Sequence, residues 1–227
     1  MHIAAVVVAA GRGNRLAADR PKAFVDLAGR TLLEHVVDTF DRSALFEESV
    51  VVAPADFVDA CRELVLHAGG RRWRVVAGGA RRQDSVRLGL GAIADAAGLV
   101  AVHDAARPLV SIELLRRTVE AAKGCGAAIA ALPVTDTVKE IDSGRIVAQP
   151  ARERLWLAQT PQVFRLDWLR EGHERFRDAA SAATDDAEIV RSLGHDVRIV
   201  AGEVSNLKIT RPEDLRLADA LLRAQSD

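Results

Sequence analysis

A continuous apolar run near the N-terminus ends in a loop of small and basic residues. Residues 3–10 are all Ile, Ala or Val, and the loop that follows carries Gly11, Gly13 and Arg15 before it reaches Pro21-Lys22. Such a run predicts a strand buried on both faces of a parallel sheet. Small residues after the strand let the backbone approach a ligand, and basic side chains suit a polyanion. We therefore expect a phosphate-binding loop, although a plain strand–loop turn with solvated arginines shares this pattern.

Two common phosphate-binding motifs are excluded. The dinucleotide fingerprint G-x-G-x-x-G requires a third glycine where this chain has Leu16. The Walker motif requires Gly-Lys followed by Ser or Thr, and the sequence contains no such segment. The loop must therefore hold a nucleotide or phosphosugar in another way.

Size and charge restrict the class of protein. The chain has 227 residues, 49% of them hydrophobic, which fits a single domain spanning residues 1–227. A formal net charge of −1 gives no general attraction to nucleic acid or to an acidic membrane, so we expect neither as a partner. The longest apolar runs are too short to cross a bilayer, and no signal-peptide pattern is present. Cys61 and Cys125 lack metal-ligand spacing, and we expect them to be buried thiols in a reducing cytoplasm.

Strand-like and helix-like segments alternate along most of the chain. The predicted strands cover residues 3–10, 49–53, 73–77, 99–103, 127–132 and 197–200. The predicted helices cover residues 31–40, 56–67, 84–97, 112–123, 167–177, 184–193 and 212–223. Thr31 and Glu34 form a capping-box pattern, Thr184 is expected to cap a later helix, and Pro212 opens the last one. This alternation predicts an α/β fold with βαβ units and a mostly parallel sheet.

The alternation breaks after Pro133. Residues 137–141 and 145–149 are short alternating segments joined by Asp142-Ser143-Gly144, which predicts a projecting β-hairpin arm inserted at about residues 134–154. Such an arm has two exposed edges that need covering. Two arrangements satisfy this need: the arm packs on a second subunit of a homodimer, or it forms a flap on its own chain.

Ligands of open α/β sheets bind beyond the carboxyl ends of the strands, where this chain places further glycines and charges. Gly78-Gly79 suits either a flat base against the backbone or a tight turn capped by Asp84 or Ser85. The turn interpretation and the base-binding interpretation both remain open at this point.

Charged residues at two other positions suit phosphates. Asp104 directly follows a predicted strand, where a carboxylate suits Mg²⁺ held on phosphates, and His103 before it is expected to fill a structural position. Arg107 suits an anion, with an internal pair to Asp104 as the structural alternative. Lys208, just before a helix start, either is solvated or directs its charge at the phosphates.

Five motifs, in order along the chain, resemble those of one enzyme family. They are Ala9-Ala10-Gly11-x-Gly13-x-Arg15 with Pro21-Lys22, Gly78-Gly79 with Ser85-Val86, His-Asp-Ala-Ala-Arg-Pro at 103–108, Thr160-Pro161-Gln162, and Asn-Leu-Lys-Ile-Thr-Arg-Pro-Glu-Asp at 206–214. Together they resemble the 2-C-methyl-D-erythritol 4-phosphate cytidylyltransferases of non-mevalonate isoprenoid synthesis over nearly the whole chain. The resemblance implies a Rossmann-like nucleotidyltransferase domain that transfers CMP from CTP to methylerythritol phosphate, with Mg²⁺ as cofactor.

The resemblance also implies roles for individual residues. Those around the CTP triphosphate would be Ala9, Ala10, Gly11, Gly13, Arg15 and Lys22, and those near the cytosine would be Gly79, Ala80 and Ser85. Asp104, Ala105 and Ala106 would meet the ribose and the metal, with Asp104 as the metal ligand. Arg107, Thr160 and Lys208 would face methylerythritol phosphate, Thr184 would support that site, and Thr137 and Arg152 would complete it from the partner subunit's arm. Arg15, Lys22 and Lys208 would be the catalytic cations.

Three positions depart from the family pattern. Val8 stands where many relatives have proline, Ala80 where an acidic residue is frequent, and Ser205 where an aspartate is frequent. The change at Val8 affects loop stiffness. The change at Ala80 removes a side-chain contact to the base, and the change at Ser205 removes a carboxylate near Lys208. Every proposed catalytic cation is retained.

Two other functions share part of this pattern. A cytidylyltransferase for ribitol 5-phosphate or another sugar phosphate would use the same loop and aspartate and would differ on the acceptor side. A non-catalytic nucleotide-binding subunit would keep the fold and lose the charged residues, whereas Arg15, Lys22, Asp104, Arg107 and Lys208 are all present.

Overall fold

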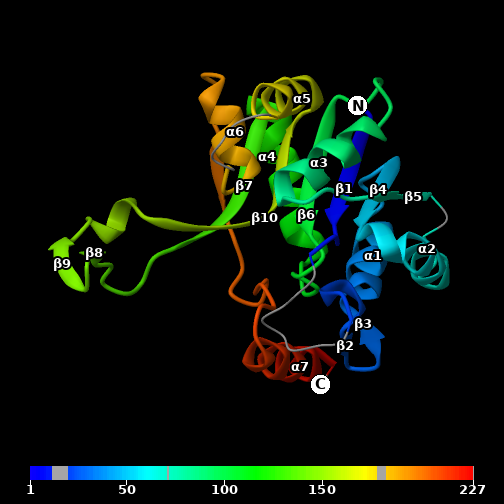
Figure 1. Ribbon diagram of the computed structural model, residues 1–227, viewed down its shortest axis with the longest axis horizontal. Helices are drawn as coiled ribbons and strands as arrows, with labels where there is room; N and C mark the ends of the chain where they lie inside the picture. The colour runs from blue at the N-terminus through cyan, green and yellow to red at the C-terminus, as the bar shows by residue number, and fades with distance from the viewer. Residues whose placement is uncertain (12–19, 71, 178–182, 227) are drawn as a thin grey trace.

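A seven-stranded sheet forms the centre of the computed structural model, which describes residues 1–11, 20–70, 72–177 and 183–226 (Figure 1). Its strands are β1 (Ile3–Val8), β4 (Glu48–Ala53), β5 (Trp73–Ala77), β6 (Leu99–Asp104), β7 (Ala127–Pro133), β10 (Trp156–Arg165) and β11 (Arg198–Ala201). The spatial order is β11-β7-β10-β6-β1-β4-β5, and neighbouring strands are parallel except where β10 takes part. The predicted α/β class with a mostly parallel sheet is confirmed.

Helices cover both faces of the sheet because β1 is apolar at successive positions. Ala5 and Val7 pack in one cluster with α1 (Leu32–Ser43), α2 (Val58–His67) and α4 (Ile112–Cys125). Ala4 and Val6 pack in another cluster with α3 (Arg82–Gly91), α5 (Leu166–Arg175) and α6 (Asp186–Ser192). All four of these β1 side chains are fully buried, as alternating positions of a strand with two covered faces should be.

The last helix, α7 (Pro212–Ser226), lies near a short hairpin formed by β2 (Asp26–Leu27) and β3 (Arg30–Thr31) (Figure 1). Ile209 and Ala218 are fully buried in a small cluster with Leu27 and Leu32. The chain before α7 is thereby anchored to the body, which fixes the segment that carries Lys208.

The order of the strands creates a ligand-binding edge. From β1 the chain continues to β4 and β5 on one side, and only then crosses to β6 on the other side of β1. Such a reversal leaves a crevice beyond the carboxyl ends of the two adjacent strands. Here β1 and β6 pair in register from Ile3 with Leu99 to Val8 with Asp104, so both strands end at this crevice.

Strand β10 was missed by the sequence analysis. It lies between β6 and β7 and is antiparallel to both, with a register shift between Ala158 and Gln162 and a cis peptide bond between Thr160 and Pro161. Proline and glutamine inside the segment hid its strand character, because a proline removes a ladder donor and argues against an interior strand. A bulge of this kind redirects side chains, and here it places Thr160 beside the end of β6.

Most helix boundaries agree with the prediction, with two corrections. The capping box of Thr31 and Glu34 is present and α7 begins at Pro212. Helix α3 ends at Gly91 rather than at residue 97. Helix α6 begins at Asp186 with Asp185 as its cap, because the Asp185 carboxylate accepts from the Glu188 N–H at 3.0 Å, while Thr184 binds the Glu188 carboxylate.

The predicted arm is present and extends away from the body (Figure 1). Its strands are β8 (Glu140–Asp142) and β9 (Arg145–Ala148), joined through Ser143 and Gly144, which both have positive φ. Every residue of the two strands is exposed, including Ile141, Ile146 and Val147. An isolated hairpin with exposed apolar side chains is marginally stable in water, so this arm needs another surface to pack on.

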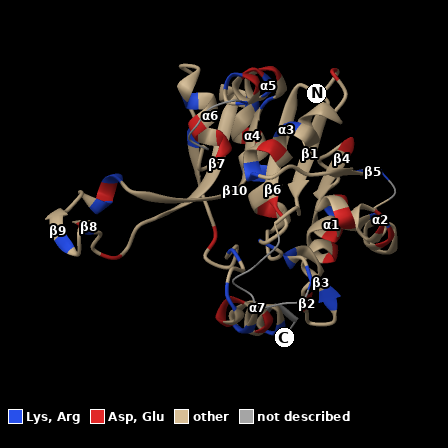
Figure 2. Ribbon diagram, viewed as in Figure 1, with Lys and Arg blue, Asp and Glu red and all other residues tan. Residues whose placement is uncertain are grey.

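Charges of both signs are mixed along α5 and α7 (Figure 2). None of the helices in the described ranges combines the length and the apolarity that a bilayer span requires. Cys61 and Cys125 are free thiols. Burial raises the pKa of the Cys61 thiol to about 12, whereas Cys125 is only partly buried because it is the last residue of α4.

We predict that Gly89→Ala destabilises the fold. A Cβ at Gly89 of α3 would lie 2.6 Å from Val6 Cγ1 and 2.8 Å from Val52 Cγ2, both on buried strands. Overpacking of this kind should lower the free energy of unfolding, measured by urea denaturation, by about 1–3 kcal/mol. Gly91→Ala is the matched control on the same helix, where a Cβ meets nothing within 4 Å; it should raise stability by up to about 1 kcal/mol. Equal effects of the two substitutions would contradict this packing.

Candidate functional site

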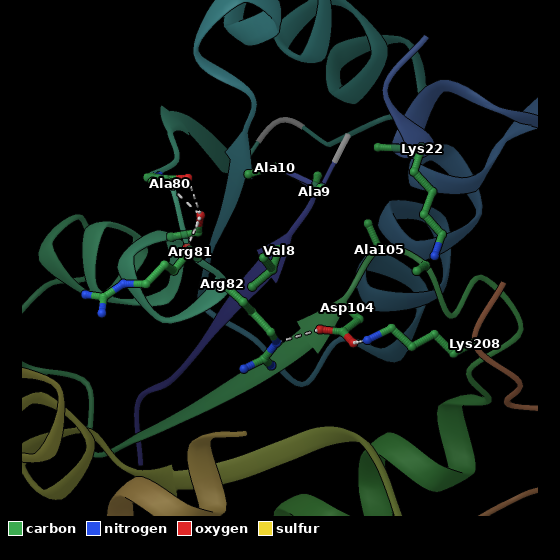
Figure 3. A pocket seen from close by; sticks show the side chains of 15 residues that line it. Val8, Ala9, Ala10, Lys22, Ala80, Arg81, Arg82, Asp104, Ala105 and Lys208 are labelled. Carbon is green, nitrogen blue, oxygen red and sulfur yellow. Dashed lines mark hydrogen bonds and ion pairs between the residues drawn. The ribbon is translucent and has the colours of Figure 1, made fainter. Parts of the chain in front are cut away.

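A cleft opens where β1 and β6 end, and we call it the main cleft (Figure 3). The resemblance assigns a set of residues to the nucleotide. All of these that fall within the described ranges line the main cleft. These residues are Ala9, Ala10, Gly11, Lys22, Gly79, Ala80, Ser85, Asp104, Ala105 and Ala106, and Lys208 joins them. Gly13 and Arg15 lie outside the described residues.

Backbone hydrogen bonds hold the loops of the main cleft at one edge of the sheet. The Ala9 N–H donates to the Val52 carbonyl at 2.8 Å, and the Gly78 N–H donates to the Ala53 carbonyl at 2.7 Å. The Ala105 N–H donates to the Val8 carbonyl at 3.0 Å. Each bond continues a sheet ladder past the end of its strand, so the loop backbones are fixed before any ligand arrives.

Asp104 stands at the centre of the main cleft between two cations (Figure 3). Its Oδ1 accepts from Arg82 Nε at 3.1 Å, and its Oδ2 lies 2.7 Å from Lys208 Nζ. Burial by itself would raise the pKa of this carboxyl, but Arg82 and Lys208 outweigh burial and hold the pKa well below its usual range. Asp104 is therefore a carboxylate at neutral pH.

Lys22 and Lys208 reach the main cleft from different parts of the chain. Lys22 opens the short 3₁₀ turn Lys22–Phe24, and Figure 3 shows its side chain extending toward Ala105. Lys208 is placed by its neighbours, because the Ile209 N–H donates to the Ala106 carbonyl at 2.8 Å. The sheet edge thus brings together two of the four lysines of the chain.

The glycine turn after β5 has a clear structural requirement. A Cβ at Gly78 would lie 2.6 Å from the Ala10 Cβ, so the protein's own packing excludes a side chain there. The Ser85 hydroxyl accepts from the Gly79 N–H at 3.1 Å and can donate to the Arg81 carbonyl at 3.2 Å. The turn interpretation is confirmed for Ser85. Gly79, Ala80 and Ser85 also line the main cleft, and base binding there stays a prediction.

His103 fills a structural position, as predicted. It is fully buried, and burial lowers its pKa to about 4, so the ring is neutral at pH 7. Its Nδ1 lies 3.0 Å from the Thr160 hydroxyl, and its Nε2 lies 3.1 Å from the Arg107 carbonyl. The Thr160 hydroxyl also accepts from the Asp104 N–H at 3.1 Å, so it ties β10 to the end of β6.

A second cleft adjoins the main one, and we call it the adjoining cleft. Its lining consists of Arg82, Asp104, Arg107, Ala158, Gln159, Thr160, Gln162, Thr184, Asp185 and Lys208. The two clefts share Arg82, Asp104 and Lys208. Arg107, Thr160 and Thr184, which the resemblance assigns to the acceptor side, therefore lie beside the expected nucleotide side.

Arg107 braces the loops of the adjoining cleft. Its Nη1 donates to the Asn206 carbonyl at 2.8 Å and its Nη2 donates to the Ala158 carbonyl at 3.3 Å, so Asp104 pairs with Arg82 and Lys208 instead. Its Nε is buried and has no hydrogen-bond partner among the described residues. Two backbone carbonyls thus fix the guanidinium beside the adjoining cleft.

Thr137 and Arg152 are not brought to either cleft of the same chain. Both are exposed on the arm, where Arg152 Nη1 donates to the Thr135 carbonyl at 2.9 Å. Figure 1 shows the arm directed away from the carboxyl edge of β1 and β6.

Arg82 is a site residue that the sequence analysis did not identify. It is the first residue of α3 and lies in the predicted glycine turn, where only Gly79, Ala80 and Ser85 were singled out. The sequence signal for Arg82 was a basic residue beside a strand end. This signal is weak, because many other arginines of the chain have no role in the site.

Comparisons with known proteins identify the family. The model of the 2-C-methyl-D-erythritol 4-phosphate cytidylyltransferase family matches residues 3–224. The chain belongs to this family. The 2-C-methyl-D-erythritol 4-phosphate cytidylyltransferase of Rhodococcus jostii is 46% identical over 222 residues, covering 97% of this chain and 95% of that protein. The one of Geobacter metallireducens is 42% identical over 228 residues, covering 98% of each.

Solved structures of this cytidylyltransferase family have the same fold. The 4-diphosphocytidyl-2C-methyl-D-erythritol synthase of Anaerococcus prevotii matches with a TM-score of 0.86 and 32% identity over 98% of each chain. The 2-C-methyl-D-erythritol 4-phosphate cytidylyltransferase of Thermus thermophilus matches with a TM-score of 0.79 and 38% identity, covering 98% of this chain and 100% of that chain. The protein is therefore an enzyme of the nucleotidyltransferase class.

The donor set of the cytidylyltransferase site is compatible with one divalent cation. Among the described residues no group of three or more His, Cys, Asp or Glu side chains converges as a metal centre, and Asp104 is the one carboxylate in the main cleft lining. Mg²⁺ commonly combines one or two carboxylates with substrate phosphates. A carboxylate offers about four lone-pair sites, so contacts with Arg82 and Lys208 leave Asp104 able to accept a cation.

We predict that Asp104 makes stability depend on acid pH. Its pKa is lower in the folded chain than the ordinary value of 3.8, so the unfolded chain binds its proton first as pH falls. The contribution of the Asp104 carboxylate to the free energy of unfolding is complete above about pH 4, and it is lost as the pH drops through the folded-state pKa. The free energy of unfolding, measured by urea denaturation at pH 5, 4 and 3, should fall less steeply with decreasing pH for Asp104→Asn than for the unaltered protein. The two slopes should differ by at most about 1.4 kcal/mol per pH unit. An unchanged slope would contradict this assignment.

Proposed function

We propose that the protein transfers the cytidylyl group of CTP to 2-C-methyl-D-erythritol 4-phosphate, giving 4-diphosphocytidyl-2-C-methyl-D-erythritol and pyrophosphate. The observation that carries this proposal is the convergence of Lys22, Asp104 and Lys208 at the switch point of the sheet. Membership of the cytidylyltransferase family over residues 3–224 supplies the substrate class.

The main cleft suits CTP. Ala9, Ala10 and Gly11 present backbone with little side-chain bulk at the end of β1, where N–H groups can bind phosphates. Gly79, Ala80 and Ser85 lie across the cleft, and we assign them to the cytosine. Asp104, Ala105 and Ala106 lie between these two sides and suit the ribose. Gly13 and Arg15, which lie outside the described residues, are proposed to complete the triphosphate site.

The adjoining cleft suits methylerythritol phosphate. The Arg107 guanidinium lines this cleft, and its positive charge supports an anion there. Thr160 and Thr184 line the same cleft. Lys208 borders both clefts, which supports a role between the two reacting phosphates.

The reaction requires charge neutralisation more than proton transfer. A phosphate oxygen of the acceptor, already anionic near neutral pH, attacks the α-phosphorus of CTP. The bond from that phosphorus to the bridging oxygen breaks, and pyrophosphate leaves in line with both electrons. Lys22, Lys208 and Arg15 would hold the two polyanions together and stabilise the charge that develops on the leaving oxygen. A Mg²⁺ ion, with Asp104 as its ligand, would supply further neutralisation of the phosphates when bound.

The arm supports a homodimer. Exposed Ile141, Ile146 and Val147 give it an apolar surface, and its projection from the body suits packing on a second copy. Thr137 and Arg152 would then reach the acceptor site of the partner. We place the reaction in the cytoplasm, where CTP is available and where free thiols such as Cys61 and Cys125 persist.

We predict that Lys22→Ala and Lys208→Ala each lower kcat/KM by about 10²-fold, the scale for losing one preorganised transition-state contact. The assay is pyrophosphate release with CTP, Mg²⁺ and methylerythritol phosphate, with ribitol 5-phosphate as competing acceptor. Lys123→Ala is the matched control, because that lysine is on the outer face of α4 in a pair with Glu120; it should leave turnover unchanged. Full activity of either cleft variant would refute its catalytic assignment.

We predict that Arg152→Ala raises KM for methylerythritol phosphate about tenfold and KM for CTP much less, because one charged hydrogen bond to the acceptor is lost. Arg145→Ala, at the tip of the same arm, is the control and should change neither KM value.

Mixing Arg152→Ala subunits with Lys208→Ala subunits tests the shared site. A hybrid dimer would contain one site with both residues intact, so its activity at methylerythritol phosphate concentrations below KM should exceed that of either variant alone. Failure to recover activity in verified hybrid dimers would show that the arm does not act across subunits.

A further inference from the structure

A chain of paired charged and polar side chains runs from the main cleft into the protein interior. It consists of Lys208, Asp104, Arg82, Asp186 and His173, in that order. We call it the charge chain. The first three members border both clefts, whereas Asp186 and His173 come from α6 and α5 behind them. The charge chain therefore links the site to helices that contact no proposed ligand.

Asp186 uses both carboxylate oxygens within this chain. Its Oδ1 accepts from His173 Nε2 at 2.9 Å, and its Oδ2 accepts from Arg82 Nη1 at 2.8 Å. Its side chain is 1% exposed and that of His173 is 2% exposed. Burial would raise the pKa of Asp186, but Arg82 and His173 outweigh burial and lower the pKa, so the group is ionised.

The backbone of Asp186 is also fixed. Its N–H donates to Gln162 Oε1 at 3.2 Å, and the Gln162 amide donates to Asp185 Oδ2 at 3.0 Å. Strand β10 thus holds the start of α6 in place. Asp186 is a fixed negative charge rather than a side chain that follows Arg82.

The guanidinium of Arg82 is divided between two carboxylates. Its Nε donates to Asp104, and its Nη1 donates to Asp186. A guanidinium can otherwise bind one carboxylate with two parallel donors. Those parallel donors are Nε and Nη2, as in the pair of Arg81 with Asp84. Asp186 bonds to Nη1 instead and so fixes the orientation of the Arg82 group from another side, while the other Asp104 oxygen lies 2.7 Å from Lys208.

We propose that Asp186, held by His173, is a positioning residue that fixes the Arg82 guanidinium so that its Nε faces Asp104. This inference rests on the proposed function, in which Asp104 and Lys208 serve CTP and its acceptor. Asp186 is fully buried and is not among the described residues that line either cleft, so its effect passes through Arg82.

The first test is Asp186→Asn, which keeps the shape of the side chain and removes its charge. We expect kcat/KM for CTP to fall about tenfold, and we expect less than a twofold further loss when the substitution is added to Arg82→Gln. If the kcat/KM losses of the two single variants multiply in the double variant, the two residues act independently and the proposal is overturned. Circular dichroism and thermal melting establish that each variant is folded before its kinetics are compared.

The second test changes His173 and leaves the Asp186 carboxylate in place. His173→Gln keeps an N–H that can donate to Asp186, and it should retain activity within about threefold. His173→Leu removes the donor and should lose about as much kcat/KM as Asp186→Asn. Equal activity of the two His173 variants would contradict the role of His173 in holding Asp186.

Asp41→Asn is the control for loss of a carboxylate that accepts a side-chain hydrogen bond away from the clefts. Asp41 accepts from Trp73 Nε1 at 2.8 Å, and Trp73 begins β5 at the opposite edge of the sheet from the clefts. This variant should lose stability and keep the kinetic constants of the unaltered protein. A kinetic loss equal to that of Asp186→Asn would mean that destabilisation alone explains both variants.

A crystal structure of ligand-free Asp186→Asn separates failure of this inference from failure of the proposed function. An Arg82 side chain turned away from its contact with Asp104 would support the positioning role even if the unaltered protein makes no product from CTP and methylerythritol phosphate. Arg82 in its original place would overturn the positioning role, whatever the reaction is.

Discussion

Burial of β1 on both faces is the constraint on which the rest of the structure depends. Because Ala4, Ala5, Val6 and Val7 are all fully buried, helices must cover each side of the sheet. A ligand can then approach only at an edge, and the reversal of strand order between β4 and β6 opens the carboxyl edge. The chemistry that we propose is confined to that edge by packing, before any charged residue is considered.

Charge balance is the second constraint at this edge. Asp104 is nearly buried, and Arg82 and Lys208 keep it ionised. The same two cations border the space where two polyanions would meet. One carboxylate therefore keeps the cations in place without a ligand. Without such a partner, the cations would repel each other in a site of low polarity.

The buried amide and hydroxyl groups around the clefts connect the carboxyl edge of the sheet to β10. Thr160 binds the end of β6, Gln162 binds the start of α6, and the Asn206 amide donates to the Thr160 carbonyl at 2.8 Å. An antiparallel strand with a bulge, in a sheet that is otherwise parallel, thus connects the end of β6, the start of α6 and the segment that carries Asn206. Buried polar groups with satisfied hydrogen bonds favour a single arrangement, because leaving any of them unpaired is costly.

Local sequence determined the elements whose signals are contained in a short window. The apolar run of β1, the capping box of Thr31 and Glu34, the arm after Pro133 and the positions of Asp104 and Lys208 near strand and helix ends were all predictable. Only the tertiary structure decided that β10 is an interior antiparallel strand, that Arg82 pairs with Asp104, and that Arg107 bonds to carbonyl groups. The reason is separation along the chain: Arg82 and Asp186 are 104 residues apart, and Arg107 and Asn206 are 99 residues apart. The charge of a side chain can be read from the sequence, but its partner depends on which strands and helices the fold brings together.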